Sequence, residues 1–132
     1  MPEEKPRGSH SDLDRYAPQI RYAAFGEQGQ RRLLRSRVLI CGCGGLGSHL
    51  ADTLVRVGVG SVRIVDSDHV ETSNLARQIL FDESDARQGR PKALAAAKKL
   101  RRINSLVEVE PIVGRVAPSN IETLCDGVDI IV

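Results

Sequence analysis

A glycine-rich hexapeptide contains the first residues of this sequence that could do chemistry. Gly-Cys-Gly-Gly-Leu-Gly at 42–47 fits the spacing G-x-G-x-x-G and directly follows the apolar run Val-Leu-Ile-Cys at 38–41. Between a strand and a helix, such glycines bring backbone N–H groups close to a phosphate, and the positive end of the helix favours its charge. The spacing therefore predicts a nucleotide-binding loop. Its candidate residues are Gly42, Gly44, Gly45 and Gly47.

A carboxylate ends the next apolar run. Asp66 follows Val-Arg-Ile-Val at 62–65, in the position where an acidic side chain can accept hydrogen bonds from ribose hydroxyls. Two structural alternatives stay open. The glycines could serve close packing of a helix on a strand, and Asp66 could form a turn with Ser67 and Asp68.

The residues after Asp66 bear on which nucleotide binds. A dinucleotide carries about two negative charges on its pyrophosphate, which glycine N–H groups and a helix dipole can hold without help. A triphosphate needs further donors and cations. Asn74, Arg77, Gln78 and Lys92 supply them on the side of a parallel sheet where nucleotides bind. Ordinary surface charge is the alternative for Arg77 and Lys92. If Lys92 binds phosphate, we expect it to face solvent and to meet only the phosphate.

Three motifs in this order resemble the ThiF/HesA/MoeB adenylyltransferases, which are relatives of ubiquitin-activating enzymes. They are the glycine loop, the string D-x-D-x-V-x-x-S-N-L-x-R-Q at 66–78, and Gly-Arg-Pro-Lys-Ala at 89–93. The resemblance spans about residues 12–132. It implies that Gly45 lines the ATP phosphates and that Asp66 holds the ribose. It also implies that Asn74, Arg77 and Lys92 grip the triphosphate, with Gln78 in support.

The resemblance also implies a reaction. A carboxylate attacks the α-phosphorus of MgATP, which gives an acyl-adenylate and releases pyrophosphate. In this family the carboxylate usually belongs to the C-terminal glycine of a ubiquitin-like protein, often a sulfur carrier, and in a related subfamily it is attached to tRNA. Arg77 and Lys92 are then the catalytic residues, because they offset charge on the leaving pyrophosphate. ATP and Mg²⁺ are the expected cofactors, and a homodimer is the expected assembly.

This sequence departs from the family pattern in two places. Where the family often shows R-Y-x-R-Q, with a second Arg that reaches the neighbouring subunit, the chain reads Arg-Tyr-Ala-Pro-Gln at 15–19. Pro18 cannot supply that charge, for which Arg15 or Arg21 could substitute. The metal-binding Asp and the paired C-x-x-C zinc ligands of the family are expected beyond Val132, so we assign no metal ligand within the chain. We therefore expect the nucleotide-binding front part of a longer enzyme, inactive alone.

The elements that must position these residues follow from the apolar patterns. Strands are predicted at 37–42, 61–66, 107–113 and 128–132, with the first one central and the third near a sheet edge. The last one has the apolar pattern of a strand flanked on both sides, but no flanking element follows it in this sequence, so we expect an unpaired apolar edge. Leu46, Leu50, Leu54 and Val57 recur at helical spacing after the glycine loop. The fold class is thus α/β, a Rossmann-like parallel sheet with helices on both faces.

Further helices are predicted around this sheet. Residues 12–35 suggest two short helices joined by a bend, and 67–89 suggest a functional loop with a turn of helix. Pro91 opens a helix that runs to about Ile103, with Ala93, Ala96, Ala97 and Leu100 facing inward. Another helix is expected near 119–124. Residues 1–12 are predicted to form a flexible tail and 13–132 an ATP-binding domain that is truncated at its C-terminal end.

Composition excludes several classes of protein. The 132 residues are 41% hydrophobic and 27% charged, as in ordinary one-core globular domains. The net charge of +2 makes neither nucleic acid nor a membrane the default partner. There is no apolar run of membrane-spanning length and no signal peptide, which favours the cytoplasm. The three cysteines are expected to be reduced, with Cys43 and Cys125 as packing residues.

Two other functions remain open at this point. An NAD-dependent oxidoreductase would explain the glycines and Asp66, although it leaves Asn74, Arg77 and Lys92 without a role. A non-catalytic nucleotide-binding or dimerisation module is the second alternative. Exchange of labelled pyrophosphate into ATP separates all three, because only adenylation reverses in that way.

Overall fold

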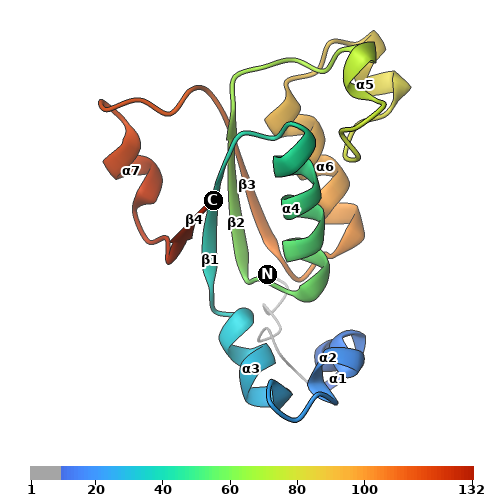
Figure 1. Ribbon diagram of the computed structural model, residues 1–132, viewed down its shortest axis with the longest axis vertical. Helices are drawn as coiled ribbons and strands as arrows, with labels where there is room; N and C mark the ends of the chain where they lie inside the picture. Colours follow the sequence, from blue (N-terminus) through green and yellow to red (C-terminus); the bar gives the residue numbers. More distant parts are fainter. Residues whose placement is uncertain (1–9) are drawn as a thin grey trace, which may run out of the picture.

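A four-stranded parallel sheet forms the centre of the protein. The structure is a computed structural model that describes residues 10–132. Its strands are β1 (Arg37–Cys41), β2 (Ser61–Asp66), β3 (Glu108–Val113) and β4 (Ile130–Ile131), in the spatial order β3-β2-β1-β4 (Figure 1). The predicted α/β class, the inner place of β1 and the edge place of β3 are confirmed.

Helices cover both faces of the sheet, as predicted. On one face, α4 (Gly45–Val57) and α6 (Lys92–Ile103) pack on the strands and enclose the larger apolar core (Figure 1). On the other face, α7 (Ile121–Cys125) contributes Leu124 to a smaller cluster with Leu39 and Val65. The alanines and Leu100 of α6 are buried as expected, which lets this helix lie close to the sheet.

Helix α4 packs on the sheet mainly through small residues and not through its first leucine. Leu46 is 77% exposed, whereas the residues buried on this helix are Ser48, Ala51 and Val55. The cause is the close approach of the helix to β1. A β-carbon built on Gly47 would lie 2.0 Å from the carbonyl oxygen of Gly42. Only small side chains fit where backbones come so near, so Leu46 is exposed, while Leu54 packs against the edge of the core.

The last strand is shorter than predicted, and its side chains are exposed. Its two residues, Ile130 and Ile131, pair with Val38 and Leu39 of β1, and both are exposed. Its consecutive apolar residues suit a strand that is flanked on both sides, and the described residues supply a neighbour on the β1 side alone. Among these residues no further strand lies outside β4, so its outer edge and both of its faces meet solvent.

An N-terminal helical segment lies at the end of the sheet where the strands begin (Figure 1). It consists of α1 (His10–Leu13), the 3-10 helix η1 (Asp14–Tyr16), α2 (Ala17–Ile20) and α3 (Gly26–Leu33). Asn104, which is buried, attaches it by donating hydrogen bonds to the Tyr16 hydroxyl and to the Val55 carbonyl oxygen, both 2.9 Å long.

The predicted flexible tail at 1–12 overlaps this segment. Residues 10–12 are helical in α1, and the flexibility of the tail stays a prediction. Residues 1–9 lie outside the described part of the chain.

The long connection after β2 contains two short helices, as the predicted turn of helix requires. They are η2 (Thr72–Asn74) and α5 (Glu83–Arg87), and they lie at the end of the sheet where the strands finish (Figure 1). This connection leads into α6, which begins at the predicted position. Within the described residues no helix is both long and apolar enough to cross a bilayer.

Candidate functional site

The candidate site lies at the carboxyl ends of the parallel strands. Gly42 follows β1 with φ +98°, a conformation that favours glycine, and its N–H donates to the carbonyl oxygen of Val65 at 2.8 Å. The chain then turns into α4, whose first residue is Gly45. Gly47 lets α4 pack closely against the backbone of Gly42. The alternative that the glycines serve helix packing is therefore confirmed at Gly47.

Asp66 connects the glycine loop to the connection that follows β2. Its Oδ2 accepts a hydrogen bond from the Cys43 N–H, and its Oδ1 accepts one from the Asp68 N–H, both at 2.7 Å. The structure therefore confirms that Asp66 shapes the turn. Each carboxylate oxygen can accept a second hydrogen bond, so contact with a ribose is compatible with this role and stays a prediction.

Asn74 and Arg77 approach the loop from η2 and the turns after it. The Asn74 Oδ1 accepts a hydrogen bond from the Glu71 N–H at 2.8 Å, which caps η2 and fixes the buried Asn74 side chain. Arg77 is exposed and donates from Nη1 to the Ser73 carbonyl oxygen at 3.2 Å. Its aliphatic stem runs past the first turn of α4, 3.9 Å from where a β-carbon on Gly45 would stand.

Lys92 differs from the expectation of a solvent-facing residue. Its side chain is only 7% exposed, and its ammonium lies 3.8 Å from the Asp68 carboxylate. The Lys92 N–H also donates to the Asp68 carbonyl oxygen at 2.9 Å. The alternative of ordinary surface charge is therefore excluded for Lys92. Its stem is buried at the start of α6.

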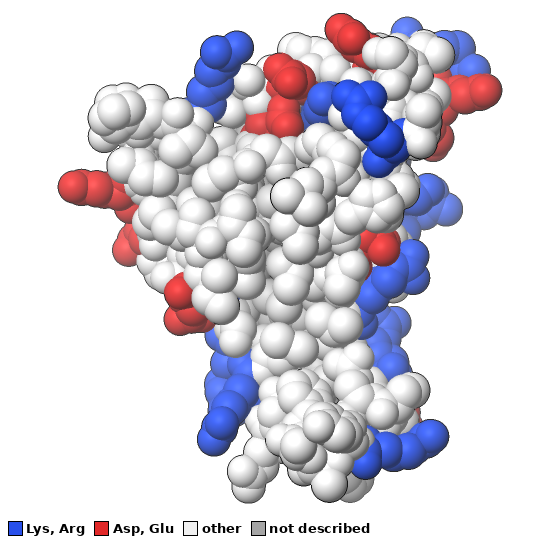
Figure 2. Space-filling model, in the orientation of Figure 1, with Lys and Arg blue, Asp and Glu red and all other residues white. Residues whose placement is uncertain are grey.

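Asn74, Arg77 and Lys92 line one hollow of about 500 Å³. Figure 2 shows acidic and basic side chains close together at this end of the molecule. Asp66 and the glycines do not line this hollow, and Gly42, Gly44 and Gly47 line a separate one of about 220 Å³. Four of the lining residues were not predicted as site residues, although Ser67, Asp68, His69 and Glu71 belong to the same 66–78 string. The residues that line the hollow of about 500 Å³ are Ser67, Asp68, His69, Glu71, Asn74, Arg77 and Lys92.

Gln78 is a buried polar residue beside the glycine loop. It is 2% exposed, its amide nitrogen lies 3.9 Å from a β-carbon built on Gly44, and its Oε1 has no hydrogen-bond partner. A buried amide oxygen without a partner costs free energy, so a donor is expected to reach it when the site is filled. This fits the supporting role that the resemblance gives to Gln78.

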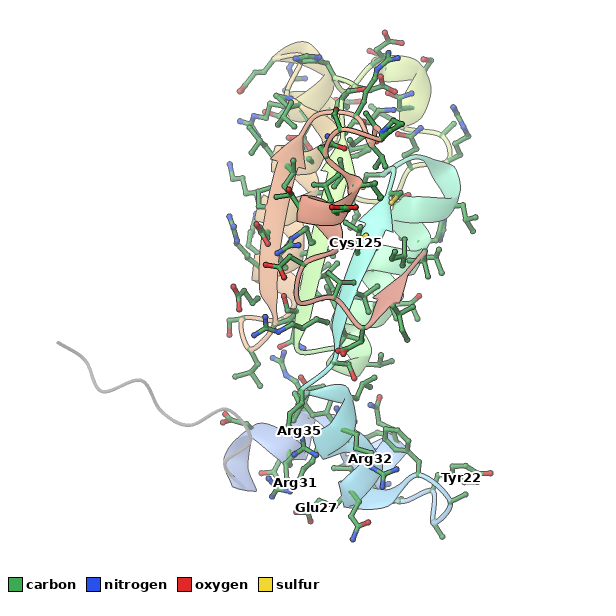
Figure 3. The ribbon with its side chains drawn as sticks, turned by 90° about the vertical axis from the view of Figure 1, so that its left-hand side faces the viewer. Tyr22, Glu27, Arg31, Arg32, Arg35 and Cys125 are labelled. Carbon is green, nitrogen blue, oxygen red and sulfur yellow. The ribbon has the colours of Figure 1, made fainter. Side chains whose placement is uncertain are left out.

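Cys43, the cysteine within the glycine loop, is a packing residue, as predicted. Cys43 is fully buried, and burial, together with the neighbouring Asp66 carboxylate, raises its pKa to about 12. The helix N-terminus does not make it a reactive thiolate. Cys125 lies on α7 and packs against the smaller apolar cluster (Figure 3), and burial also raises the pKa of Cys41. All three cysteines are free.

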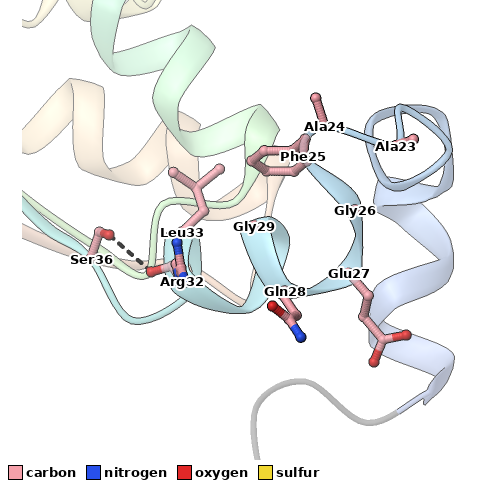
Figure 4. A pocket seen from close by; sticks show the side chains of 10 residues that line it. All are labelled: Ala23, Ala24, Phe25, Gly26, Glu27, Gln28, Gly29, Arg32, Leu33 and Ser36. Atoms are coloured by element: carbon pink, nitrogen blue, oxygen red, sulfur yellow. Dashed lines mark hydrogen bonds between the residues drawn. The ribbon is translucent and has the colours of Figure 1, made fainter.

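A larger hollow of about 600 Å³ lies on the N-terminal segment, away from the glycine loop. Residues of α3 and of the loop before it line this hollow, where the Ser36 hydroxyl donates to the Arg32 carbonyl oxygen at 2.9 Å (Figure 4). Tyr22 and Arg35 lie on the same segment (Figure 3). None of the sequence-predicted nucleotide residues lines this hollow, so it is not the candidate site.

Two arginines were predicted to substitute for the charge that Pro18 lacks. Arg15 lies in η1, and Arg21 directly follows α2. Their predicted action is on a neighbouring subunit, which a single chain does not test. Within residues 10–132 no group of three His, Cys, Asp or Glu side chains could hold a metal ion.

Comparison with known proteins agrees with this geometry. Residues 16–132 match the model of the ThiF family. The Bacillus subtilis (strain 168) sulfur carrier protein ThiS adenylyltransferase is 48% identical over 118 residues, which cover 89% of this chain and 35% of the relative. The Haloferax volcanii SAMP-activating enzyme E1 is 44% identical over 122 residues, covering 92% of this chain and 44% of the relative.

Solved structures show the same fold. A structure of PaaA matches with a TM-score of 0.87 at 31% identity, covering 96% of this chain and 42% of PaaA. The Escherichia coli tRNA N6-threonylcarbamoyladenosine dehydratase TcdA, solved in complex with ATP, matches with a TM-score of 0.80 at 27% identity, covering 90% of this chain and 47% of TcdA. The chain thus spans less than half the length of these relatives.

Proposed function

The chain belongs to the ThiF family, and from this premise we propose that its protein uses ATP to adenylate a carboxylate on a protein partner. The substrate that we propose is the C-terminal glycine of a ubiquitin-like sulfur-carrier protein. Support for this choice comes from relatives at 41–48% identity whose names describe activation of sulfur carriers or of SAMP.

The observation that carries the proposal is the convergence of Asn74, Arg77 and Lys92 in one hollow beside the first turn of α4. Two cations and the N-terminal end of a helix suit a triphosphate better than the pyrophosphate of a dinucleotide. An NAD-dependent oxidoreductase would leave this group without a function. The convergence therefore favours ATP.

The residues of the site fit ATP by their chemistry. Gly45 leaves space beside the Arg77 stem where a phosphate can approach the backbone, and Gln78 has a free amide oxygen. Asp66 would hold the ribose, while Asn74, Arg77 and Lys92 would hold the phosphates. These donors and cations would stabilise negative charge without acting as nucleophiles.

The reaction balances without a redox partner. A carboxylate oxygen of the carrier forms a bond to the α-phosphorus of ATP, and the bond from that phosphorus to the bridging oxygen of the β-phosphate breaks. The electron pair leaves with pyrophosphate, whose charge Arg77 and Lys92 would offset. The product is an acyl-adenylate on the carrier, which a later step consumes.

Mg²⁺, a homodimer and a cytoplasmic location complete the proposal. Mg²⁺ commonly binds through substrate phosphates with one or two carboxylates. Since the described residues contain no three-ligand cluster, we propose that the phosphates of ATP supply most of its ligands. In a homodimer, Arg15 or Arg21 of one subunit would take the place of the arginine that Pro18 replaces and would reach the ATP site of the other subunit. The three free cysteines suit a reducing compartment.

Pyrophosphate exchange tests the proposal. The whole protein, given ATP, Mg²⁺ and a sulfur-carrier protein, should exchange labelled pyrophosphate into ATP only when the carrier's C-terminal glycine is present. Lys92→Ala should lower the exchange rate about a hundredfold. Lys98→Ala, an exposed lysine on the same helix, serves as the matched control and should leave the rate unchanged.

Three outcomes would overturn the proposal. Exchange that proceeds at the same rate without any carrier would exclude the carrier as substrate. Wild-type exchange by Lys92→Ala would exclude the role of Lys92. Binding of NAD in preference to ATP would favour the oxidoreductase.

A further inference from the structure

Lys92 is held in the hollow by its backbone rather than by its own ion pair. The ammonium is 3.8 Å from Asp68, whose side chain is 65% exposed, and an ion pair with so exposed a partner contributes little. The backbone is held more firmly. The Val70 N–H donates to the Arg90 carbonyl oxygen at 2.8 Å, and the Lys92 N–H donates to the Asp68 carbonyl oxygen at 2.9 Å. These bonds join the two segments around an antiparallel bridge of His69 and Pro91.

A second set of contacts holds the other side of this segment. The Arg90 Nη1 donates to Asp85 Oδ1 at 2.8 Å, and the Arg90 N–H donates to the Asp85 carbonyl oxygen at 3.1 Å. Asp85 is itself fixed, because its Oδ2 accepts from the Asp82 N–H and its own N–H donates to Asp82 Oδ1, both at 3.0 Å. Arg90 thus joins the capped helix α5 to the residues that enter α6.

The Asp85–Arg90 pair is built more firmly than the other ion pair of α5. Asp85 is 6% exposed, whereas Glu83 and Arg87 form an exposed pair one turn apart with a distance of 3.7 Å. The Arg90 side chain is 30% exposed, so the pair combines a buried carboxylate with a half-buried guanidinium. A charged pair that is partly buried and held by several hydrogen bonds keeps its geometry, whereas an exposed pair stays solvated. Two arginines close in the sequence therefore have different surroundings.

We propose that Asp85 and Arg90 are positioning residues for Lys92, and that their ion pair sets the affinity of the site for the triphosphate part of ATP. The inference rests on the proposed function, because it requires Lys92 to meet phosphate. Pro91 stands between Arg90 and Lys92 with a fixed φ of −55°, so the position of Arg90 is passed to Lys92 with little freedom. Arg90 touches no ligand itself. It acts by keeping the start of α6 against Asp68.

Binding measurements on the whole protein test this inference. The probes are ATP and AMP, since AMP lacks the β- and γ-phosphates that Lys92 would meet. Arg90→Gln should raise the Kd for ATP about tenfold and leave the Kd for AMP unchanged. Arg90→Lys keeps a cation opposite Asp85 and should recover part of the affinity. Arg87→Gln is the matched control and should change neither Kd.

A double-mutant cycle separates positioning from general destabilisation. If Arg90 acts through Lys92, Arg90→Gln should have no further effect on ATP binding in a Lys92→Ala background. Unchanged ATP affinity in Arg90→Gln, equal weakening of ATP and AMP, or additive effects in the cycle would each overturn the inference. When Arg90→Gln does not fold, Arg90→Lys decides alone, and wild-type ATP affinity in that variant with its melting temperature lowered would overturn it.

The same measurements distinguish failure of the inference from failure of the proposed function. A wild-type protein that binds neither ATP nor AMP would contradict the proposed function itself. A Lys92→Ala variant that binds ATP normally would remove the role of Lys92, and the positioning role of Arg90 with it. An effect of Lys92→Ala without an effect of Arg90→Gln would contradict the positioning role alone.

Discussion

Two alanine substitutions in the first turn of α4 should separate the packing role of the glycine loop from its binding role. A β-carbon on Gly47 would stand 2.0 Å from the Gly42 carbonyl oxygen and 2.9 Å from the Gly42 carbonyl carbon. Both atoms belong to the backbone, so either β1 or α4 must move. A β-carbon on Gly45 would meet nothing nearer than the Arg77 stem at 3.9 Å, an ordinary contact.

The free energies follow from these distances. Overpacking against backbone costs about 1–3 kcal/mol, from which roughly 1 kcal/mol is recovered because Ala favours a helix more than Gly does. Gly47→Ala should therefore lower the free energy of unfolding by up to about 2 kcal/mol. Gly45→Ala has no such contact and should keep or raise it by up to roughly 1 kcal/mol. A methyl group at Gly45 would instead meet the phosphates, and a steric cost of about 1–3 kcal/mol weakens ATP about 5- to 150-fold.

The assay combines thermal unfolding without ligand and isothermal titration with ATP. For a domain of this size, about 1 kcal/mol shifts the melting temperature by roughly 3–5 °C, so the two variants should be clearly separated. Gly45→Ala should retain the wild-type melting temperature and lose ATP affinity. A Gly45→Ala variant as unstable as Gly47→Ala, or one that binds ATP normally, would refute the reasoning.

Two further predictions concern the neighbours of this loop. Asp66→Asn should destabilise the fold by about 1–3 kcal/mol, because an amide offers one acceptor oxygen to the N–H groups of Cys43 and Asp68. It should also weaken ATP more than inorganic triphosphate, which has no ribose, whereas equal weakening would mean that Asp66 only shapes the turn. Since burial raises the pKa of Cys43 from 9.0 to about 12, its thiol contributes stability that is complete below pH 9 and is lost as the pH rises toward 12. Denaturant titrations near pH 8 and about pH 10.5 should therefore show a smaller alkaline loss in Cys43→Ala than in the wild type, and identical losses would contradict the shift.

Much of the fold could be predicted because its signals are local. The apolar run at 38–41 and the alanine-rich stretch after Pro91 each carry one strong pattern, and the structure has β1 and α6 in those places. A strand that is buried on both faces needs consecutive apolar residues, and a helix that lies close to a sheet needs small ones. The position of the candidate hollow followed from the same logic, since ligands bind where parallel strands end.

The features that local patterns do not predict depend on contacts between distant segments. The leucines of α4 suggested an apolar side, yet the contact between Gly47 and Gly42 decides which side packs on β1. The residues of β4 are as apolar as those of β1, but burial requires neighbours on both sides, which a run of residues does not encode. In both cases a tertiary contact overrides a correct local pattern.

The position of Lys92 depends on a local sequence pattern and also on contacts between distant segments. A lysine after Pro91 at the start of a helix is an ordinary surface residue by its local pattern. Its exposure was predicted because it was expected to meet only phosphate. Two sets of contacts hold the start of α6 against the connection after β2 and so bury Lys92. Residues 68–70 pair with residues 90–92, and Arg90 binds Asp85 of α5. A buried lysine stem with a weakly held ammonium is preorganised to meet an anion, because little side-chain freedom remains to be lost on binding. The feature that local sequence patterns could not predict is therefore the one that most favours phosphate binding.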